Sequence, residues 1–250
     1  MLKFSSANAK TASLYGVPSV APFLGGKRKV YSLDLTAGRT CPGALDCKSM
    51  VERRKDDPSR WTIKDGPKCQ FRCFSATTEL ISPTARRNRR HNHECLRKMR
   101  GAKQCYQLLA DSMPKNAGVI RYHVSGDFFK RAYLQGAVML AESRPDVLFY
   151  AYTKSLPFLE GVEFPSNFRM TVSEGGKYDS LIPSLGIRQA VVVFTEQEAE
   201  SLGLPIDHDD SHAAAEGGSF ALLIHGVQPK GTPASEALKA LKGKGSYARK

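Results

Sequence analysis

The sequence predicts an α/β protein built on an open, partial parallel β/α barrel of about six strands. Six short apolar runs alternate with helical segments, which is typical of a parallel sheet covered on both faces. A cysteine-rich, turn-rich segment follows the first of these runs, where an α/β fold places ligand-binding loops. The chain has 250 residues, 41% of them hydrophobic, and is therefore long enough to bury a full core without disulfides.

The apolar runs that predict strands cover residues 30–35, 119–124, 147–152, 168–172, 189–194 and 220–224. Helical periodicity predicts helices over residues 74–80, 84–113, 130–143 and 196–202. We expect a barrel-like domain over residues 30–226, which includes a cysteine-rich loop at 37–76. An N-terminal segment of residues 1–29 precedes it. Residues 227–250 are rich in Gly, Pro, Ser and Lys, which favours a flexible basic tail.

The cysteine-rich loop is the first candidate site. Cys41, Cys47, Cys69 and Cys73 form two pairs on short turns, with no sustained apolar period between them. Thiolate–metal bonds would offset the entropy of ordering such a long loop, so the spacing favours an iron–sulfur cluster or a zinc ion. Buried thiols that act as small apolar groups, and a disulfide framework, are the two other interpretations.

The remaining two cysteines lie in the predicted helix at 84–113. Cys95 lies on the apolar stripe of this helix, and we expect both Cys95 and Cys105 to be packed thiols. His91 and His93 nearby leave a second metal cluster as an alternative.

The charge of the chain favours a polyanionic partner. Lys and Arg number 37 against 24 Asp and Glu, a net charge of +13. The densest basic run contains Arg86, Arg87, Arg89 and Arg90, which we predict to bind nucleic acid or another polyanion. A solvated basic helix is the alternative interpretation.

No N-terminal segment resembles a secretion signal, and no apolar stretch approaches the length of a membrane span. We therefore expect no membrane partner and a cytoplasmic location, where reduced thiols are available to metal.

Polar residues follow the predicted strands at their carboxyl ends. Asp127 follows the second strand, Lys154 the third, Ser173 the fourth and His225 the last. In parallel α/β folds ligands bind at this edge, so these residues are candidates for a shared site. Taken singly, Asp127 could also be a helix N-cap and Lys154 a solvated lysine.

An acidic knot at residues 207–212 stands out in this basic chain. Asp207, His208 and His212 could hold a second, harder metal ion, and Asp209 and His212 could act as catalytic acid and base. A polar turn that caps a helix beginning at Ser211 is the alternative.

Five sequence blocks together resemble the gene product 88 family of phages and bacteria, and this likeness implies no particular activity. The blocks are Thr-Cys-Pro-Gly-Ala at 40–44, Arg-Cys-Phe-Ser-Ala at 72–76, His-Val-Ser-Gly-Asp-Phe-Phe at 123–129, Tyr-Ala-Tyr-Thr-Lys-Ser at 150–155 and Asp-His-Asp-Asp-Ser-His at 207–212.

More distantly, the chain resembles radical S-adenosylmethionine enzymes, whose partial barrel carries an iron–sulfur cluster in the loop after the first strand. The resemblance implies that Ser125, Gly126 and Asp127 bind the amino group of S-adenosylmethionine and that Ser173 contacts its ribose. The sequence departs from the usual Cys-x3-Cys-x2-Cys, since Ala76 stands three residues after Cys73.

These observations lead to three hypotheses. The first is an iron–sulfur enzyme of radical S-adenosylmethionine type that acts on nucleic acid or another polyanion, with Asp127, Lys154, Asp209 and His212 in catalysis. The second is a non-enzymatic nucleic-acid-binding protein with a structural zinc at the four cysteines. The third is a hydrolase with a metal at the acidic knot.

Overall fold

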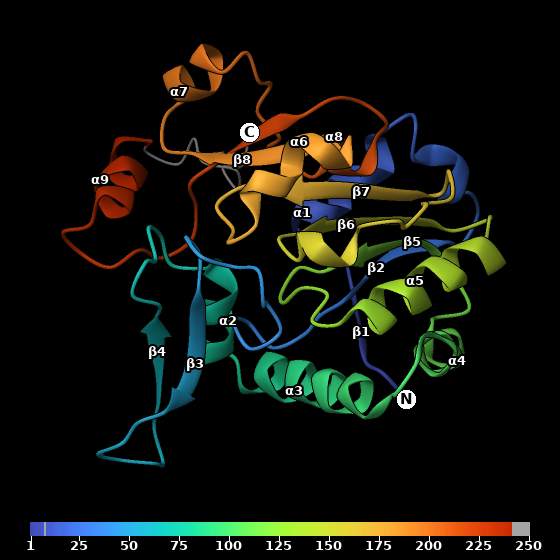
Figure 1. The fold of residues 1–250 in the computed structure, drawn as a ribbon, viewed down its shortest axis with the longest axis horizontal. Coiled ribbons are helices and arrows are strands. Elements are labelled where there is room, and N and C mark those ends of the chain that lie inside the picture. The colour runs from blue at the N-terminus through green and yellow to red at the C-terminus, as the bar shows by residue number, and fades with distance from the viewer. Residues whose placement is uncertain (8, 242–250) are drawn as a thin grey trace.

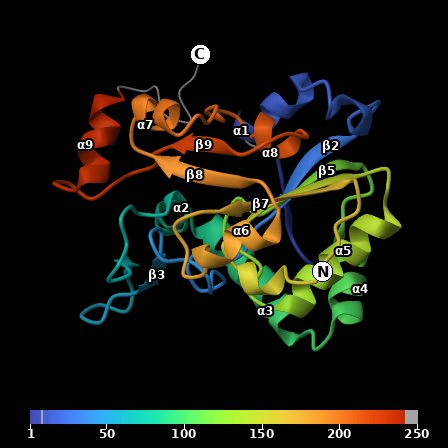
Figure 2. The same ribbon diagram turned by 45° about the horizontal axis from the view of Figure 1, so that its top comes forward.

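The computed structural model describes residues 1–7 and 9–241, which form a mixed α/β fold around one seven-stranded sheet (Figures 1 and 2). Six strands are parallel neighbours, and their order in the sheet is their order along the chain. They confirm the predicted strands and are β2 (Lys29–Leu33), β5 (Ala117–Tyr122), β6 (Leu148–Thr153), β7 (Phe168–Ser173), β8 (Gln189–Val193) and β9 (Phe220–Leu223).

Helices cover both faces of the sheet. On one face, α5 (Arg131–Ser143) packs its apolar side on Tyr122 and Phe149, with α4 (Ala102–Ser112) beside it. Gly136 allows this approach, because a Cβ there would lie 2.6 Å from the Cβ of Cys105. The other face buries a second cluster that includes Tyr150 and Phe220. Burial on both faces explains why the strands read as nearly continuous apolar runs.

The predicted helix at 84–113 is wrong in one respect, because the structure has two helices there. The first is α3 (Pro83–Lys98), and α4 follows after a break at Met99 and Gly101, both of which have extended backbones. Lys130 stabilises the break by donating hydrogen bonds from its Nζ to the carbonyls of Leu96, at 2.7 Å, and Met99.

The cysteine-rich segment is less irregular than its sequence suggests. It contains a two-stranded hairpin of β3 (Ser49–Arg53) and β4 (Trp61–Asp65), followed by α2 (Phe74–Ile81), which was predicted. Val51 pairs with Ile63 across the hairpin, and both pack towards Ala76 of α2. This small apolar cluster attaches the hairpin to the body of the protein.

The ends of the chain also belong to the fold, which corrects two predicted boundaries. β1 (Phe4–Ser6) adds an antiparallel strand to β2, so residues 1–29 are not a separate segment. At the other end, α9 (Pro233–Ala240) begins with Thr232 as N-cap and buries Ala234 and Leu241. The predicted tail therefore cannot begin at 227, and its last residues, 242–250, lie outside the described part.

Seven short helical elements complete the fold: α1 (Ala9–Ala12), η1 (Ser13–Gly16), η2 (Ala21–Phe23), η3 (Leu156–Phe158), η4 (Asp179–Leu181), α6 (Ile182–Leu185) and α8 (Ser211–Ala214). The predicted helix after β8 is α7 (Glu196–Ser201), which Thr195 caps through its side chain. Within residues 1–7 and 9–241, no helix combines the length and apolar character required to cross a bilayer.

Candidate metal centre

A cavity of about 170 Å³ lies at the carboxyl ends of the parallel strands. Its walls come from the loop after β2, the start of α2 and the ends of β5, β6, β7 and β9, which is where α/β sheets usually bind ligands. The predicted site residues that line it are Cys41, Cys47, Cys73, Gly126, Asp127, Lys154, Ser173 and His225. An adjoining cavity of about 130 Å³ shares Cys47, Cys73, Lys154, Ser173 and His225.

The loop from Cys41 to Cys47 reaches the cavity because it docks on the ends of β6 and β7. The backbone N–H of Asp46 donates a hydrogen bond to the carbonyl of Gly175 at 3.0 Å. Gly43 packs directly on the backbone of Lys154, where an added Cβ would lie 1.8 Å from the carbonyl oxygen. Only glycine fits this contact, so the loop position depends on Gly43.

Cys73 enters the cavity from the opposite side, as the N-cap residue of α2. Its backbone N–H donates to the hydroxyl of Ser49 at 3.2 Å, which ties α2 to the hairpin. Burial raises the pKa of the Cys73 thiol to about 11, and the charge of Cys47 adds to this effect. The backbone N–H groups of Ser75 and Ala76 act in the opposite direction but are weaker.

The three cavity thiols are electrostatically coupled. Burial raises the pKa of Cys41 well above its ordinary value, and the charges of Asp127, Cys73 and Cys47 raise it further. Burial also raises the pKa of Cys47, while the ammonium group of Lys154 lowers it. Gathering thiolates in this buried position is unfavourable without a nearby cation.

Cys69 does not line the cavity, although it lies close enough to Cys47 for the charge of that thiolate to raise its pKa, after the larger effect of burial. Its Sγ donates to the carbonyl of Phe71 at 3.0 Å and lies 3.7 Å from the hydroxyl of Ser49. The structure thus brings three of the four predicted metal cysteines together and leaves the fourth in a hydrogen-bonded turn.

The arrangement of the thiols does not match a site for one metal ion. Among the described residues, no group of three or more His, Cys, Asp or Glu side chains is arranged to hold an ion. Tetrahedral zinc, with Zn–S bonds of about 2.3 Å, requires sulfurs only about 3.8 Å apart. An iron–sulfur cluster binds its thiolates through different irons and accepts wider spacing.

Asp127 is fully occupied by hydrogen bonds from its own chain. Its Oδ1 accepts from the backbone N–H of Phe128 and the hydroxyl of Thr153, both at 2.7 Å. Its Oδ2 accepts from the backbone N–H of Lys154 at 2.9 Å and the hydroxyl of Ser155 at 3.1 Å. A carboxylate accepts about four hydrogen bonds, so none is left for an ammonium group. Nor is Asp127 a helix N-cap, because α5 begins only at Arg131.

Burial raises the pKa of Asp127 to about 6, although all four of its hydrogen bonds favour the charged form. The side chain is only 4% exposed. The carboxylate therefore acts as a clamp between the loops that follow β5 and β6.

Lys154 points across the cavity to the end of β7. Its Nζ donates to the hydroxyl of Ser173 at 2.9 Å, to the carbonyl of Ser173 at 3.2 Å and to the carbonyl of Glu174. All three protons of the ammonium group are used, and the residue is buried rather than solvated. The hydroxyl of Ser173 accepts from Lys154 and keeps its own proton for a ligand.

Of the Ser125–Gly126 pair, only Gly126 lines the cavity. The Ser125 hydroxyl instead lies 3.4 Å from the Oε1 of Glu79. Gly126 has a φ of +88°, and a Cβ there would lie 2.5 Å from the hydroxyl of Thr40. The turn at Gly126 therefore packs directly against Thr40, the residue before Cys41.

His123 is a cavity residue that the sequence analysis missed. It is 4% exposed, and its Nε2 forms a hydrogen bond with the hydroxyl of Tyr133 at 2.8 Å. Within the described residues, its Nδ1 is buried without a hydrogen-bond partner. Burial lowers the pKa of His123 to about 3, so the ring is neutral and Nδ1 can serve a ligand. The predicted strand at 119–124 included His123, so only the earlier end of β5 at Tyr122 reveals that the histidine follows the strand.

The acidic knot at 207–212 lies outside the cavity. Asp207 is completely buried and accepts from the backbone N–H groups of Asp209 and Ala213, and Asp209 accepts from that of Ser211. His208 is exposed, and His212 faces a different surface pocket. The hydrogen bonds of the acidic knot therefore mainly stabilise the turn at residues 207–212. The structure does not place Asp209 or His212 near the thiols.

Asp210 connects this knot to the sheet. Its carboxylate pairs with Arg121 of β5 and accepts from the hydroxyls of Tyr150, at 3.0 Å, and Tyr152, at 3.4 Å. Both Asp210 and Arg121 are buried, so the acidic knot contributes a structural ion pair.

The helical histidines and cysteines also form no metal cluster in the described structure. Cys105 is buried in the main core, and Cys95 packs against that core. His91 contacts the carbonyl of Met1 at 2.9 Å, while the ring of His93 packs against Phe129.

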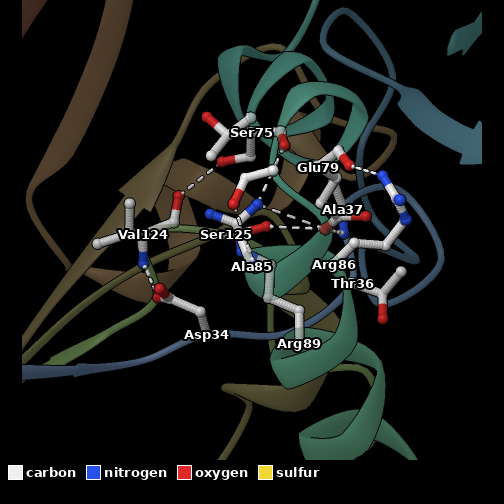
Figure 3. Close-up of polar contacts among 12 residues, drawn as sticks. Asp34, Thr36, Ala37, Ser75, Glu79, Ala85, Arg86, Arg89, Val124 and Ser125 are labelled. Carbon is white, nitrogen blue, oxygen red and sulfur yellow. Dashed lines mark hydrogen bonds and ion pairs between the residues drawn. The ribbon is translucent and has the colours of Figure 1, made fainter. Parts of the chain in front are cut away.

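The predicted nucleic-acid-binding arginines are not equivalent. Figure 3 shows the carboxylate of Glu79 pointing towards both the guanidinium of Arg89 and the backbone amide of Ala37. The distances are 3.5 Å to Arg89 Nη1 and 2.7 Å to the Ala37 nitrogen. Arg89 is 5% exposed and also donates to the carbonyl of Ser75, so its predicted role at an interface is wrong. Arg87 and Arg90 are exposed.

Fold and site together define a mixed α/β protein with a mostly parallel sheet and a cysteine-lined cavity at the carboxyl ends of its strands. A family model described as Gene product 88 matches residues 2–244, so the chain belongs to the gene product 88 family. No curated protein and no solved structure gives a significant match.

Proposed function

We propose that the chain is an iron–sulfur protein in which Cys41, Cys47 and Cys73 hold the cluster. One observation carries the proposal: three thiols from two separate loops line a single cavity at the ligand-binding edge of the sheet. Burial raises the pKa of all three thiols, so a bound cluster would have to offset the cost of forming buried thiolates. Such a cluster supplies single electrons when it is bound.

The proposal includes a partial β/α barrel of the kind found in radical S-adenosylmethionine enzymes. Six parallel strands in chain order support this architecture, and so does a cysteine loop that directly follows the first of them. Three cysteine ligands, rather than four, would leave one iron of a four-iron cluster without a protein thiolate. This supports an enzyme more than a purely structural centre.

The proposed role of Asp127 differs from the role that the resemblance implies. Because its four acceptor positions are filled, Asp127 is a positioning residue that keeps Lys154 and Ser155 in place. The free hydroxyl proton of Ser173 and the Nδ1 atom of His123 are the groups we propose to contact S-adenosylmethionine.

Anaerobic purification followed by iron, sulfide and zinc analysis tests the cluster. We expect brown protein with acid-labile sulfide, and loss of iron in Cys41→Ser, Cys47→Ser and Cys73→Ser. Cys69→Ser is the matched control and should keep its iron. Colourless wild-type protein with stoichiometric zinc, lost equally from all four variants, would establish a structural four-cysteine zinc site instead.

Calorimetry on the reconstituted protein then tests the cosubstrate. S-Adenosylmethionine should bind wild type, and Ser173→Ala should weaken binding while iron content stays unchanged. An intact cluster that fails to bind S-adenosylmethionine would restrict the proposal to electron transfer.

A further inference from the structure

The single tryptophan of the chain, Trp61, gathers three arginines from two separate elements. The guanidinium carbon of Arg53, its partner across the hairpin, lies 4.0 Å from the ring centroid. Those of Arg86 and Arg90, from α3, lie at 4.5 and 5.3 Å. Cation–π attraction to one ring therefore holds three like charges together.

These cations are also fixed by hydrogen bonds. Arg86 donates from Nη1 to the carbonyls of Glu79 and Leu80, and Arg53 donates to the carbonyl of Ser59 at 2.8 Å. A guanidinium held in this way loses little entropy when it binds an anion, because its donors are already oriented.

The positive charges of the arginines around Trp61 are not neutralised by carboxylates of the described residues. In the described part of the chain, no carboxylate lies within 4.0 Å of a nitrogen of Arg53, Arg86, Arg87 or Arg90. The pKa of Arg86 is lowered, first by burial and then by the charges of Arg53, Arg90 and Arg87, although Glu79 acts in the opposite direction. Clustered cations that repel one another without a counter-charge are typical of an anion-binding surface.

We propose that the surface formed by Arg53, Trp61, Arg86 and Arg90 binds the phosphate groups of a nucleic acid backbone. Arginine is suited to this role, because its planar group donates two parallel hydrogen bonds to one phosphate. The net charge of +13 adds long-range attraction for a polyanion. The three guanidinium groups already lie over the tryptophan ring, so the surface contacts phosphates rather than stacked bases.

The surrounding charges favour an extended polyanion over a single phosphate. Exposed Lys55 and Arg60 add positive charge at the hairpin turn, where Asp56 and Asp57 lie between them, and exposed Arg87 adds positive charge on α3. Figure 1 shows that the hairpin of β3 and β4 stands out from the body of the molecule beside α2. Several phosphates in a row can contact such a surface at once.

Tryptophan fluorescence gives a direct test, since the only tryptophan lies at the centre of the surface. Full-length protein is titrated with a single-stranded oligothymidylate and with a mixed-sequence DNA duplex, each end-labelled so that anisotropy reports binding independently. We expect binding at low salt together with a change in Trp61 emission. With three to four phosphate contacts, log K should fall against log salt with a slope of about −2 to −3 for the single strand and about −3 to −4 for the duplex.

Two double variants with the same change in net charge locate the interface. Arg53→Ala with Arg90→Ala should weaken binding at least tenfold and make the salt slope shallower by about two. Lys98→Ala with Lys103→Ala should change affinity less than threefold, because these exposed residues lie at the C-terminal end of α3 and in α4. Circular dichroism verifies that both proteins are folded.

The variants Trp61→Phe and Trp61→Leu distinguish the contribution of the aromatic ring to DNA affinity from that of the arginine charges. Phenylalanine keeps an aromatic face and should bind within about threefold of wild type, whereas leucine should bind more weakly because the arginines lose their platform. The inference is overturned if neither DNA binds, if both double variants weaken binding equally, or if Trp61 emission stays constant while anisotropy rises. Binding to phosphatidylglycerol vesicles without binding to DNA would overturn it as well, in favour of a membrane surface.

Discussion

The Oδ2 atom of Asp127 lies 2.9 Å from the backbone nitrogen of Lys154, and this contact joins the loops at the ends of β5 and β6. The same carboxylate receives three further hydrogen bonds. Lys154 in turn reaches Ser173 at the end of β7. Three neighbouring strand ends are therefore connected through one buried anion and one buried cation.

Asp127→Asn should destabilise the protein, because an amide replaces one acceptor oxygen with a donor that faces other donors. We expect a loss of about 1.5 to 3 kcal/mol in the free energy of unfolding, measured by urea denaturation. Asp111→Asn is the matched control, since Asp111 is exposed and accepts from Gln107, and it should cost less than about 0.5 kcal/mol. Equal stability of Asp127→Asn and wild type would contradict the clamp.

Gly43→Ala should displace the cysteine loop, since the new Cβ would overlap the carbonyl oxygen of Lys154. We expect a loss of about 3 kcal/mol in stability. Iron content after reconstitution should fall with it. Gly25→Ala meets no atom within 4 Å and provides the control, with wild-type iron content. A Gly43→Ala protein that binds iron normally would show that the docked loop is unnecessary for the site.

Glu79→Leu should cost about 3 to 5 kcal/mol, because it leaves the buried charge of Arg89 without its partner. Combining Glu79→Leu with Arg89→Leu should cost less than the sum of the two single changes. A double-mutant cycle on unfolding free energies measures this coupling. Strict additivity would show that the two side chains do not interact.

His123 should make the metal-free protein sensitive to mild acid. Its pKa is about 3 in the folded state and near 6.5 when it is unperturbed, so between these values the unfolded chain binds the proton more tightly. The contribution of His123 to stability should therefore fall by about 2 kcal/mol between pH 7 and pH 5, whereas Asp127, whose pKa is raised to about 6, contributes with the opposite sign over the same range.

Asp127 titrates in both wild type and His123→Asn. The difference between the two proteins in their loss of unfolding free energy on acidification therefore measures the contribution of His123 alone. Urea denaturation at the two pH values, with a chelator present, supplies the measurement. His123→Asn should lose less stability on acidification, and an identical loss in both proteins would contradict the neutral, buried imidazole.

The sequence was a good guide wherever one local pattern decides the structure. β6 is an apolar run that follows a Pro-Asp turn, and parallel strands buried on both faces produce such runs. The sequence analysis missed β3 and β4 for two reasons. Only one face of the hairpin packs on the body of the protein, through Val51 and Ile63, so the apolar pattern is weak. The connecting loop also lacks the two-residue turn that marks a tight hairpin.

The site was less predictable, because it depends on contacts between distant residues. Arg89 looks like its exposed neighbours Arg87 and Arg90, and only the approach of Glu79 from α2 shows that it is buried. Likewise, spacing along the chain cannot separate Cys69 from Cys73. The difference arises when α2 directs one thiol into the cavity and a turn at Phe71 holds the other.

The docking of Asp46 on Gly175 has a consequence for the order of biosynthesis. At about 5 to 20 residues per second, the ribosome adds the roughly 130 residues between them in roughly 6 to 26 seconds. During that time the nascent chain carries Cys41 and Cys47 without the surface that positions them. The loop that carries Cys41 and Cys47 can therefore dock only after β7 has been synthesised, so the proposed cluster would be loaded late in translation or after it.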